Sequence, residues 1–550
     1  MKKMTVKPPV NFTTTSTKLG KLIDIAIEKN LIQRTSVLYL LLMDTIIGLQ
    51  KQEEEFNKKN EKYNKNKTKP KAKGMRYHPL VIKWCCFLAR KWHEKGYESI
   101  RNILPLPHWQ TIKQYRQTSS SSESINQENI RRMVQEMERR NCKGIGGIHW
   151  DEMIIQEGIV VCKRTGELVG FENLEIPMEI TNDSCSTQNE NDESDIYESE
   201  FSDSESDETS SGSSSGKIDF NECPQSKTHS KAKMICQFFF SSIEGDFSWP
   251  VASFPVRQMN CQKLKVLVWK VIKVLSQKTI NGKNIQVLYG VCDGSSYSHA
   301  FFRKSNVQNW VCFNPYNNDV PIWWLSDYPH LIKKLRNFMV DQDRNMKWGE
   351  QEINSEHLTD VVERKQTKLR WKHLKLSART KMSVKRAVEL CSEEVVMDIC
   401  QGSFPLQETI GIRIYLSMCA TLFKIMNNST EVDPSSYRDL VKILVWFKNW
   451  HHEIQTTMPH SGLRNEHWKK FITVRTYKDL LRSIRAFLGL VQYVQSNYPN
   501  SIIIPKTMCQ DDVENYFSLQ RAHIASAQPT VLQYFESAVT LNTNLLLTSE

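Results

Sequence analysis

The chain has 550 residues, of which 40% are hydrophobic, and a net charge of +12, so we expect several domains with buried cores and a surface that attracts a polyanion such as nucleic acid. Its 14 cysteines include no Cys-x-x-Cys pair, which excludes a zinc-finger or disulfide scaffold and favours reduced intracellular thiols. No apolar stretch reaches the length of a membrane span and no cleavable signal peptide is recognisable, so we expect a soluble protein without a membrane partner.

Residues 1–75 are the first predicted unit, a helical segment followed by a basic linker. A heptad pattern runs through residues 39–63, but Glu53 and Asn60 occupy core positions. A coiled-coil dimerisation segment and a short helical hairpin therefore both fit. Residues 58–76 contain nine Lys or Arg residues and only one acidic residue. That run fits a nuclear-import or DNA-backbone tract as well as it fits a solvated linker.

Residues 76–142 are predicted to form a helix-turn-helix domain. An apolar helix ends at Gly96, a second helix follows it, and a third begins after the Pro-Leu-Pro turn at residues 105–107. This spacing is typical of helix-turn-helix units, in which Lys113 and Arg116 of the third helix would bind DNA. A purely structural three-helix unit fits the same pattern.

Residues 143–310 are predicted to be the first part of an α/β catalytic domain. The predicted strands are residues 148–151, 158–162, 167–171, 233–241, 249–254 and 285–292. Apolar residues at helical spacing from Leu264 to Leu275 predict one amphipathic helix before the last strand. A strand meander, a helix and a further strand, with acids at the first and last strand ends, is the order of a ribonuclease-H-like fold.

An acidic tract interrupts this domain, and we expect residues 182–217 to be a disordered surface insertion. From 182 to 216 there are 11 acidic residues, 12 serines and no Lys or Arg. Removing these negative charges from the net +12 leaves +23 on the remaining chain, which favours nucleic-acid binding. A basic surface is also common among soluble proteins, so that alternative stays open.

Three acids stand beside apolar residues at distant points of the chain, namely Asp151, Asp293 and Glu514. The first two end predicted strands, and the third lies in a predicted helix that begins near Asp511, within the final part of the domain at residues 501–550. Oxygen ligands suit Mg²⁺ or Mn²⁺, whose charge offsets the repulsion among carboxylates. Taken singly, a strand-end Asp is more often a turn or cap residue. Together they predict one metal site.

Residues 311–500 are predicted to be a mostly α-helical insertion into the catalytic domain. Asp327 is predicted to cap a helix, on which Lys333, Lys334 and Arg336 are candidate DNA-binding residues. The whole chain is thus predicted to be a helical N-terminal region followed by an α/β domain with a large helical insertion.

Five short motifs follow one another along the chain. They are Leu104-Pro105-Leu106-Pro107, Trp150-Asp151-Glu152-Met153, Cys292-Asp293-Gly294, Ser326-Asp327-Tyr328-Pro329-His330-Leu331-Ile332-Lys333 and Gln510-Asp511-Asp512-Val513-Glu514-Asn515-Tyr516-Phe517. In this order they resemble the motifs of the P-element-type DNA transposases, whose vertebrate relatives carry THAP domains. The resemblance covers residues 76–545, and its specificity comes from the order of five motifs that are each weak alone.

The resemblance implies that Asp151, Asp293 and Glu514 are the catalytic, metal-binding acids of a ribonuclease-H-like domain. Two Mg²⁺ or Mn²⁺ ions would activate the attacking oxygen and stabilise the leaving one. It implies hydrolysis at an element's end and then attack of the freed 3′-hydroxyl on target DNA. It also implies a nuclear location, DNA ends and target DNA as partners, and a homo-oligomer.

Members of this family bind GTP in the insertion as an architectural cofactor. The resemblance places Phe423 and Asn427 at that site. Lys424 stands where the family has a guanine-reading Asp, and a lysine cannot accept hydrogen bonds from the base. This argues against GTP selectivity.

The relatives begin with a zinc module that reads DNA, and this chain shows no counterpart, so targeting would depend on the helix-turn-helix or on a partner. Two functions are therefore expected: a metal-dependent DNA transposase, or a domesticated DNA-binding or protein-interaction factor that keeps the fold without transposing. A plain ribonuclease or repair nuclease fits less well, because such enzymes rarely carry so long an insertion before the last acid.

Overall fold

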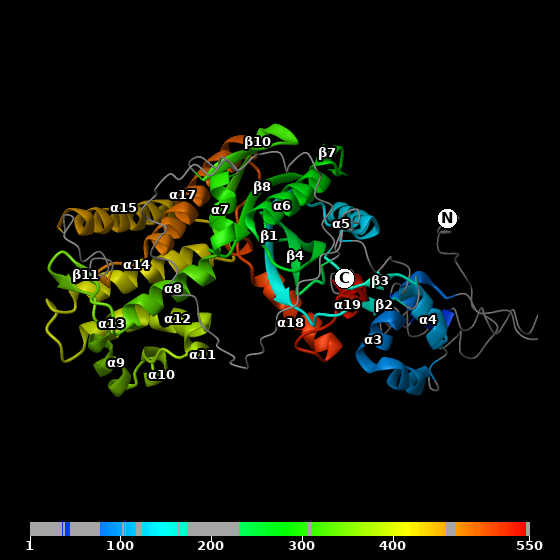
Figure 1. Ribbon diagram of the computed structural model, residues 1–550, viewed down its shortest axis with the longest axis horizontal. Helices are drawn as coiled ribbons and strands as arrows, with labels where there is room; N and C mark the ends of the chain where they lie inside the picture. Colours follow the sequence, from blue (N-terminus) through cyan, green and yellow to red (C-terminus); the bar gives the residue numbers. More distant parts are fainter. Residues whose placement is uncertain are drawn as a thin grey trace, which may run out of the picture.

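The computed structural model describes residues 36, 39–43, 77–101, 104, 106–116, 124–162, 166–172, 230–304, 310–457 and 469–545. The predicted coiled-coil segment lies outside these residues except for residues 36 and 39–43, and so do the basic run and the acidic tract. Figure 1 shows a central sheet between a large group of helices on the left and a pair of helices, α3 and α4, on the right.

The central sheet has six strands in the order β5-β4-β1-β8-β10-β9. Their bounds are β1 Ile145–Ile154, β4 Met234–Ser242, β5 Ser248–Val256, β8 Gln286–Cys292, β9 Val311–Asn314 and β10 Asn317–Ser326. β1, β4 and β5 form the antiparallel meander, β8 and β10 continue it in parallel, and β9 is an antiparallel edge. The inner parallel strand β8 is buried from Val287 to Cys292, as expected where both faces of a sheet are covered.

Two predicted strands lie outside this sheet. Residues 160–161 (β2, Val160–Val161) and 168–169 (β3, Leu168–Val169) pair only with each other. Val161 and Leu168 expose 53% and 58% of their surface, so this ribbon has too little buried apolar surface to extend the core. The prediction that they continue the meander was wrong.

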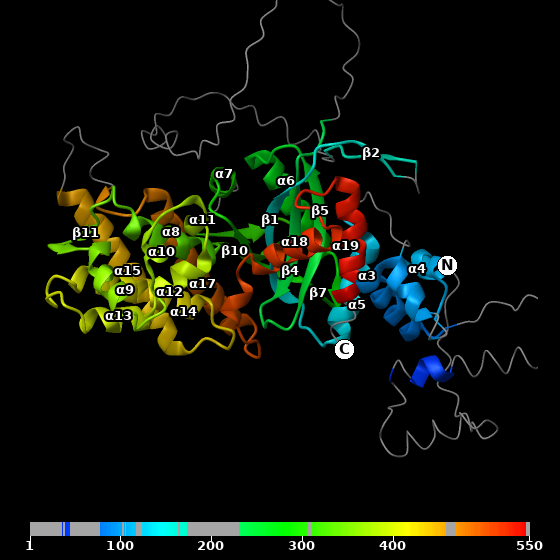
Figure 2. The same cartoon turned by 90° about the horizontal axis from the view of Figure 1, so that it is seen from below.

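Helices cover both faces of the sheet. One face carries α5 (Gln127–Arg139), α6 (Cys261–Ser276) and α7 (Ser296–Lys304), which pack in one apolar cluster with β1, β4, β5 and β8. The other face carries α18 (Asp511–Ile524), α19 (Val531–Leu545) and α17 (Val474–Asn497). Figure 2 shows α18 and α19 lying across the strands. Because α5 packs on β5, it belongs with the sheet and not with a separate DNA-binding domain at 76–142.

Only two helices of the predicted helix-turn-helix are found among the described residues. α3 runs without a break from Pro79 to Arg101, and α4 covers Trp109–Arg116. The predicted stop at Gly96 was wrong, because Tyr97 continues the buried face of α3 and donates a hydrogen bond of 2.8 Å to the carbonyl of Pro107. One glycine inside a helix costs only about 1 kcal/mol, which this packing offsets.

The helical insertion begins with α8 (Tyr328–Val340), later than predicted, because residues 311–326 are strands of the sheet. Its other helices are α9 Thr359–Arg364, α10 Trp371–Leu374, α11 Ala378–Lys381, α12 Val384–Leu390, α13 Glu393–Cys400, α14 Ile410–Met426 and α15 Pro434–Thr457, with the ribbon β11 Lys347–Trp348 and β12 Gln351–Glu352. Smaller elements are β6 Thr279–Ile280, β7 Lys283–Asn284 and the 3₁₀ turns Ser355–Leu358 and Pro505–Thr507. α17 packs on β10 and also on α8 and α15, so insertion and sheet share one apolar core.

No helix in the described part of the chain combines the length and hydropathy needed to cross a bilayer.

Candidate active site

Two neighbouring parallel strands bring Asp151 and Asp293 to the same edge of the sheet. His149 of β1 is in register with Val291 of β8, and each acid stands two residues beyond this pair. Asp293 directly follows β8. Asp151 lies inside β1, which ends only at Ile154, and beyond His149 that strand pairs with β4 alone. Asp293 also accepts a hydrogen bond of 3.3 Å from the backbone N–H of Ser295, which turns the chain toward α7.

The third acid, Glu514, is held over this edge by α18. The apolar side of that helix, with Val513, Tyr516 and Phe517 buried, packs against β1 and β4. The ring of Tyr516 meets that of Phe239 edge-on at 5.3 Å. The predicted helix start at Asp511 is confirmed, and Glu514 lies on the opposite, polar side in the first turn.

Electrostatics link the three acids. The pKa of Asp151 is raised to about 7, mainly by burial. The charges of Asp293 and Glu514 contribute to this rise, whereas the hydrogen bond from the backbone N–H of Glu152 and the charge of His330 oppose it. Burial also raises the pKa of Glu514. Across the described ranges, no three His, Cys, Asp or Glu side chains are close enough to hold a metal ion together. The acids therefore share one field of excess negative charge, which suits a hard cation, without forming a closed ligand set.

Glu152 is a fourth acid that the sequence did not single out. Strand alternation sends it to the face of β1 opposite Asp151, where Tyr297 of α7 donates a 2.8 Å hydrogen bond to Oε2. Its Oε1 is buried without a partner. Burial raises its pKa to about 8, and Asp293 and Asp151 add to the rise. Its place inside the Trp-Asp-Glu-Met motif was the signal that could have found it.

Asp327 ties the start of α8 to the start of α18. Its carboxylate accepts the backbone N–H of His330 at 3.0 Å, as a predicted N-cap, and that of Gln510 at 2.9 Å. It also lies 2.6 Å from Nδ1 of His330. Burial lowers the pKa of His330, but the hydrogen bond and charge of Asp327 outweigh it and leave that pKa raised. Asp327 thus favours the protonated form of His330, which lies in the field of Asp151 and Glu514.

The predicted DNA contacts of α8 are mostly internal. Arg336 is fully buried and donates a 2.6 Å hydrogen bond to the carbonyl of Thr380, so its assignment as a DNA contact was wrong. Lys333 is only 7% exposed; burial lowers its pKa, while Glu514, Asp327 and Asp151 oppose this. Lys334 lies 3.5 Å from the buried Asp479. Sequence spacing identified the helix but not which of its sides faces the core.

Lys113 and Arg116 lie in the second half of α4, and their contact with DNA stays a prediction.

The predicted nucleotide residues lie at the end of α14, beside the start of α8. The rings of Phe423 and Tyr328 are 6.0 Å apart, and the Tyr328 hydroxyl donates a 3.4 Å hydrogen bond to Asn427. The exposed Lys424 forms an ion pair of 3.1 Å with Glu393. These contacts give the residues a packing role, and nucleotide binding stays a prediction.

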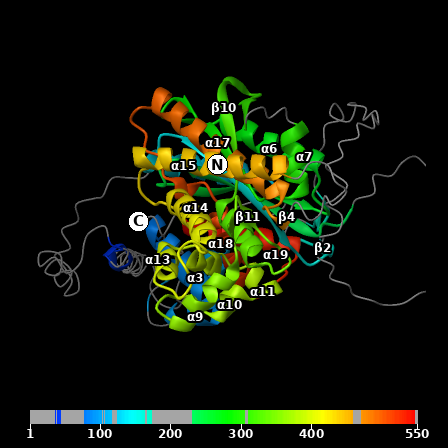
Figure 3. The same ribbon diagram turned by 90° about the vertical axis from the view of Figure 1, so that its left-hand side faces the viewer.

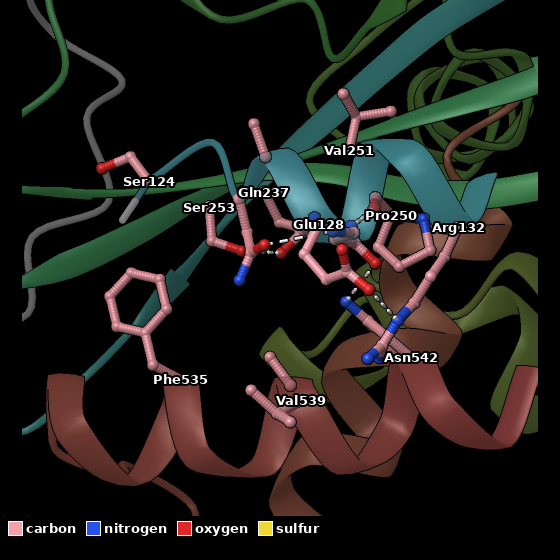
Figure 4. Close-up of a pocket in the computed structure, with 14 residues that line it drawn as sticks. Ser124, Glu128, Arg132, Gln237, Pro250, Val251, Ser253, Phe535, Val539 and Asn542 are labelled. Atoms are coloured by element: carbon pink, nitrogen blue, oxygen red, sulfur yellow. Dashed lines mark hydrogen bonds and ion pairs between the residues drawn. The ribbon is translucent and has the colours of Figure 1, made fainter. Parts of the chain in front are cut away.

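A pocket elsewhere on the sheet is separate from the acids. It lies among α5, β5 and α19, and neither Asp151, Asp293 nor Glu514 lines it. Figure 4 shows Gln237 and Ser253 in contact inside it. Gln237 accepts hydrogen bonds from Ser253 at 2.5 Å and from Tyr534 at 2.9 Å. These polar side chains of the pocket are therefore already hydrogen-bonded to one another.

Residues 205–305 match the family TNP-like, RNase H N-terminal domain. The chain is also similar to the solved structure "Drosophila P element transposase strand transfer complex", with a TM-score of 0.62 and 14% sequence identity, over 86% of this chain and 92% of that chain. The chain resembles a P-element-type transposase. No curated protein matches it. The P-element-type resemblance seen in the five motifs and the ribonuclease-H-like fold are thereby confirmed.

Proposed function

We propose that the protein is a metal-dependent DNA transposase of the P-element type, with Asp151, Asp293 and Glu514 as its metal ligands. The observation that carries this proposal is the register of β1 and β8, which sets two acids side by side, with Glu514 held above them by α18. DNA as the substrate is supported by the similar solved structure, a strand transfer complex. A nuclear location and a homo-oligomer belong to the same proposal.

Each residue has a definite part in the proposed reaction. The three acids would hold divalent ions, which supply activation of the attacking oxygen and stabilisation of the leaving one when bound. Water attacks a phosphodiester at the element's end, and the bond from phosphorus to the 3′-oxygen breaks. The freed 3′-hydroxyl then attacks a phosphodiester of the target DNA, whose own 3′-oxygen leaves as a hydroxyl. His330 and Lys333 add positive charge beside Glu514, where a phosphate's negative charge would lie.

The test is a cleavage assay with Mg²⁺ or Mn²⁺ on duplexes that contain inverted repeats flanking the gene. We expect Asp151→Asn and Glu514→Gln to abolish cleavage, because each removes a charged ligand, and chelation to abolish it in the parent. Asp512→Asn is the matched control on the same helix. Asp512 accepts hydrogen bonds from Ser248 at 2.6 Å and Ser241 at 3.2 Å, so its role is structural and activity should persist.

Undiminished cleavage by Asp151→Asn would contradict the site. A second candidate function is a domesticated DNA-binding factor, favoured by the lack of a closed metal-ligand group among the described residues. A parent protein that binds DNA but neither binds Mn²⁺ nor cleaves would support that function instead.

A further inference from the structure

A strongly basic segment of the insertion has no part in the site described so far. Residues 364–386 contain ten Lys or Arg residues and no Asp or Glu. Eight of these cations are exposed, namely Lys365, Lys368, Arg370, Lys372, Lys375, Arg379, Lys381 and Lys385. None of the eight forms an ion pair within 4.0 Å with any residue that the structure describes. The segment is therefore a concentrated positive surface, in which only Lys368 and Lys385 are near enough to Glu389 to lower its pKa, together with the larger effect of His373.

An exposed tryptophan stands in the middle of this surface. Trp371, the first residue of α10, exposes 47% of its area. It lines an open hollow together with Val362, Glu363, Lys365, Arg370 and Lys372. A flat apolar ring among cations suits a ligand that offers both a phosphate backbone and unstacked bases.

The turn that presents Trp371 is firmly held. The Arg370 guanidinium donates to the carbonyl of Thr367 at 2.7 Å, and the Arg370 backbone N–H donates to Nδ1 of the buried His373 at 2.9 Å. His373 in turn lies 2.8 Å from Glu389 of α12. The indole thus stays exposed although neighbouring groups are tightly packed, so its exposure is not caused by a loose loop.

The segment is anchored to the helix that starts at the acids. Arg336 and Asn337 of α8 donate hydrogen bonds of 2.6 and 3.3 Å to the carbonyls of Thr380 and Lys381. Arg336 follows His330 by six residues, which is about 9 Å along a helix. Figure 1 places α10, α11 and α12 on the same lower side of the molecule as α18, and Figure 3 shows α9 to α11 along its lower edge.

We propose that residues 364–386 bind single-stranded DNA, with lysines on its phosphates and Trp371 stacked on a base, beside the acid site. The link to catalysis rests on the proposed function, whereas the binding itself does not. Duplex DNA would use the lysines but offers no free base to the indole. A peptide made of acidic residues alone would also use the lysines but offers no flat ring to the indole.

The test measures binding of a labelled oligothymidylate to the full chain carrying Asp151→Asn, in chelator, so that cleavage plays no part. We expect Trp371→Leu to weaken binding about 5- to 150-fold, the range for loss of one stacked base, and Trp371→Phe to restore most of it. A triple Lys→Gln change at 368, 372 and 375 should lower the salt slope by about 2, near 0.7 per phosphate on a single strand.

The matched control removes the same charge elsewhere, by Lys→Gln at 231, 283 and 448, which are exposed positions outside the segment. Its salt slope should stay close to that of the parent. Equal binding by Trp371→Leu, an equal slope change in the control, or equal competition by polyglutamate would overturn the proposal. If a variant melts early, photocrosslinking of iododeoxyuridine to the parent decides instead: a crosslink at Trp371 supports the proposal, and crosslinks only elsewhere refute it.

Discussion

Asp151 and Glu152 are neighbours on β1 whose side chains lie on opposite faces of the sheet, yet both are in the field of Asp293. Burial raises their pKa values to about 7 and about 8. The folded protein therefore keeps protons at neutral pH that the unfolded chain releases. Such groups contribute stability that is full below the ordinary carboxyl pKa near 4 and is lost as pH rises through 7 to 8.

This predicts how a divalent ion affects stability. Ligands must be deprotonated to bind a metal, so Mn²⁺ should raise the melting temperature more at pH 8 than at pH 5.5, measured by differential scanning fluorimetry. Without metal, Asp151→Asn together with Glu152→Gln should flatten the loss of stability between these pH values. An equal Mn²⁺ effect at both pH values would contradict the assignment.

At the scale of elements, the start of α8 and the start of α18 are joined through one carboxylate. Asp327→Ala would remove a helix cap, worth about 0.5–2 kcal/mol, and leave the buried N–H of Gln510 unpaired at about 1–3 kcal/mol. We expect a larger loss of unfolding free energy than for Ser392→Ala, a plain cap at α13. Urea denaturation measures both variants, and equal losses would refute the joint role.

Some of the elements and site residues could be predicted from the sequence, and others could not. Asp293 was predictable because the apolar strand β8 ends just before it, and α18 was predictable from its apolar side. Asp151 was identified as an acid beside an apolar segment, but the predicted strand end there was wrong, because β1 continues to Ile154. The burial of Arg336 was not predictable, because helical spacing alone does not show which side of a helix faces the core. Gly96 does not end the helix because tertiary packing of Tyr97 overrides local propensity. Glu152 was not predicted because strand alternation puts it on the face opposite Asp151, where its partner Tyr297 comes from a distant helix.

At the scale of the whole molecule, α17 joins the insertion to the sheet. A Cβ on Gly489 would lie 2.6 Å from Nε1 of Trp323 in β10, so the helix rests directly on the strand. We therefore expect tryptophan fluorescence and far-UV circular dichroism to report one coincident unfolding transition, and Gly489→Val to shift both probes together toward lower denaturant. Two separate transitions would show that the insertion folds independently.

The anchoring of the basic segment on α8 has a consequence for how the protein would measure its substrate. A helix is a stiff rod, and here the first turn of α8 is bound to Asp327 near the acids while a later turn binds Thr380 of the basic segment. The separation between the gripped base and the cut phosphate would then be constant. The number of nucleotides between the base bound at Trp371 and the cleaved phosphodiester would then be fixed. The cleavage position would depend on this length as well as on the DNA sequence.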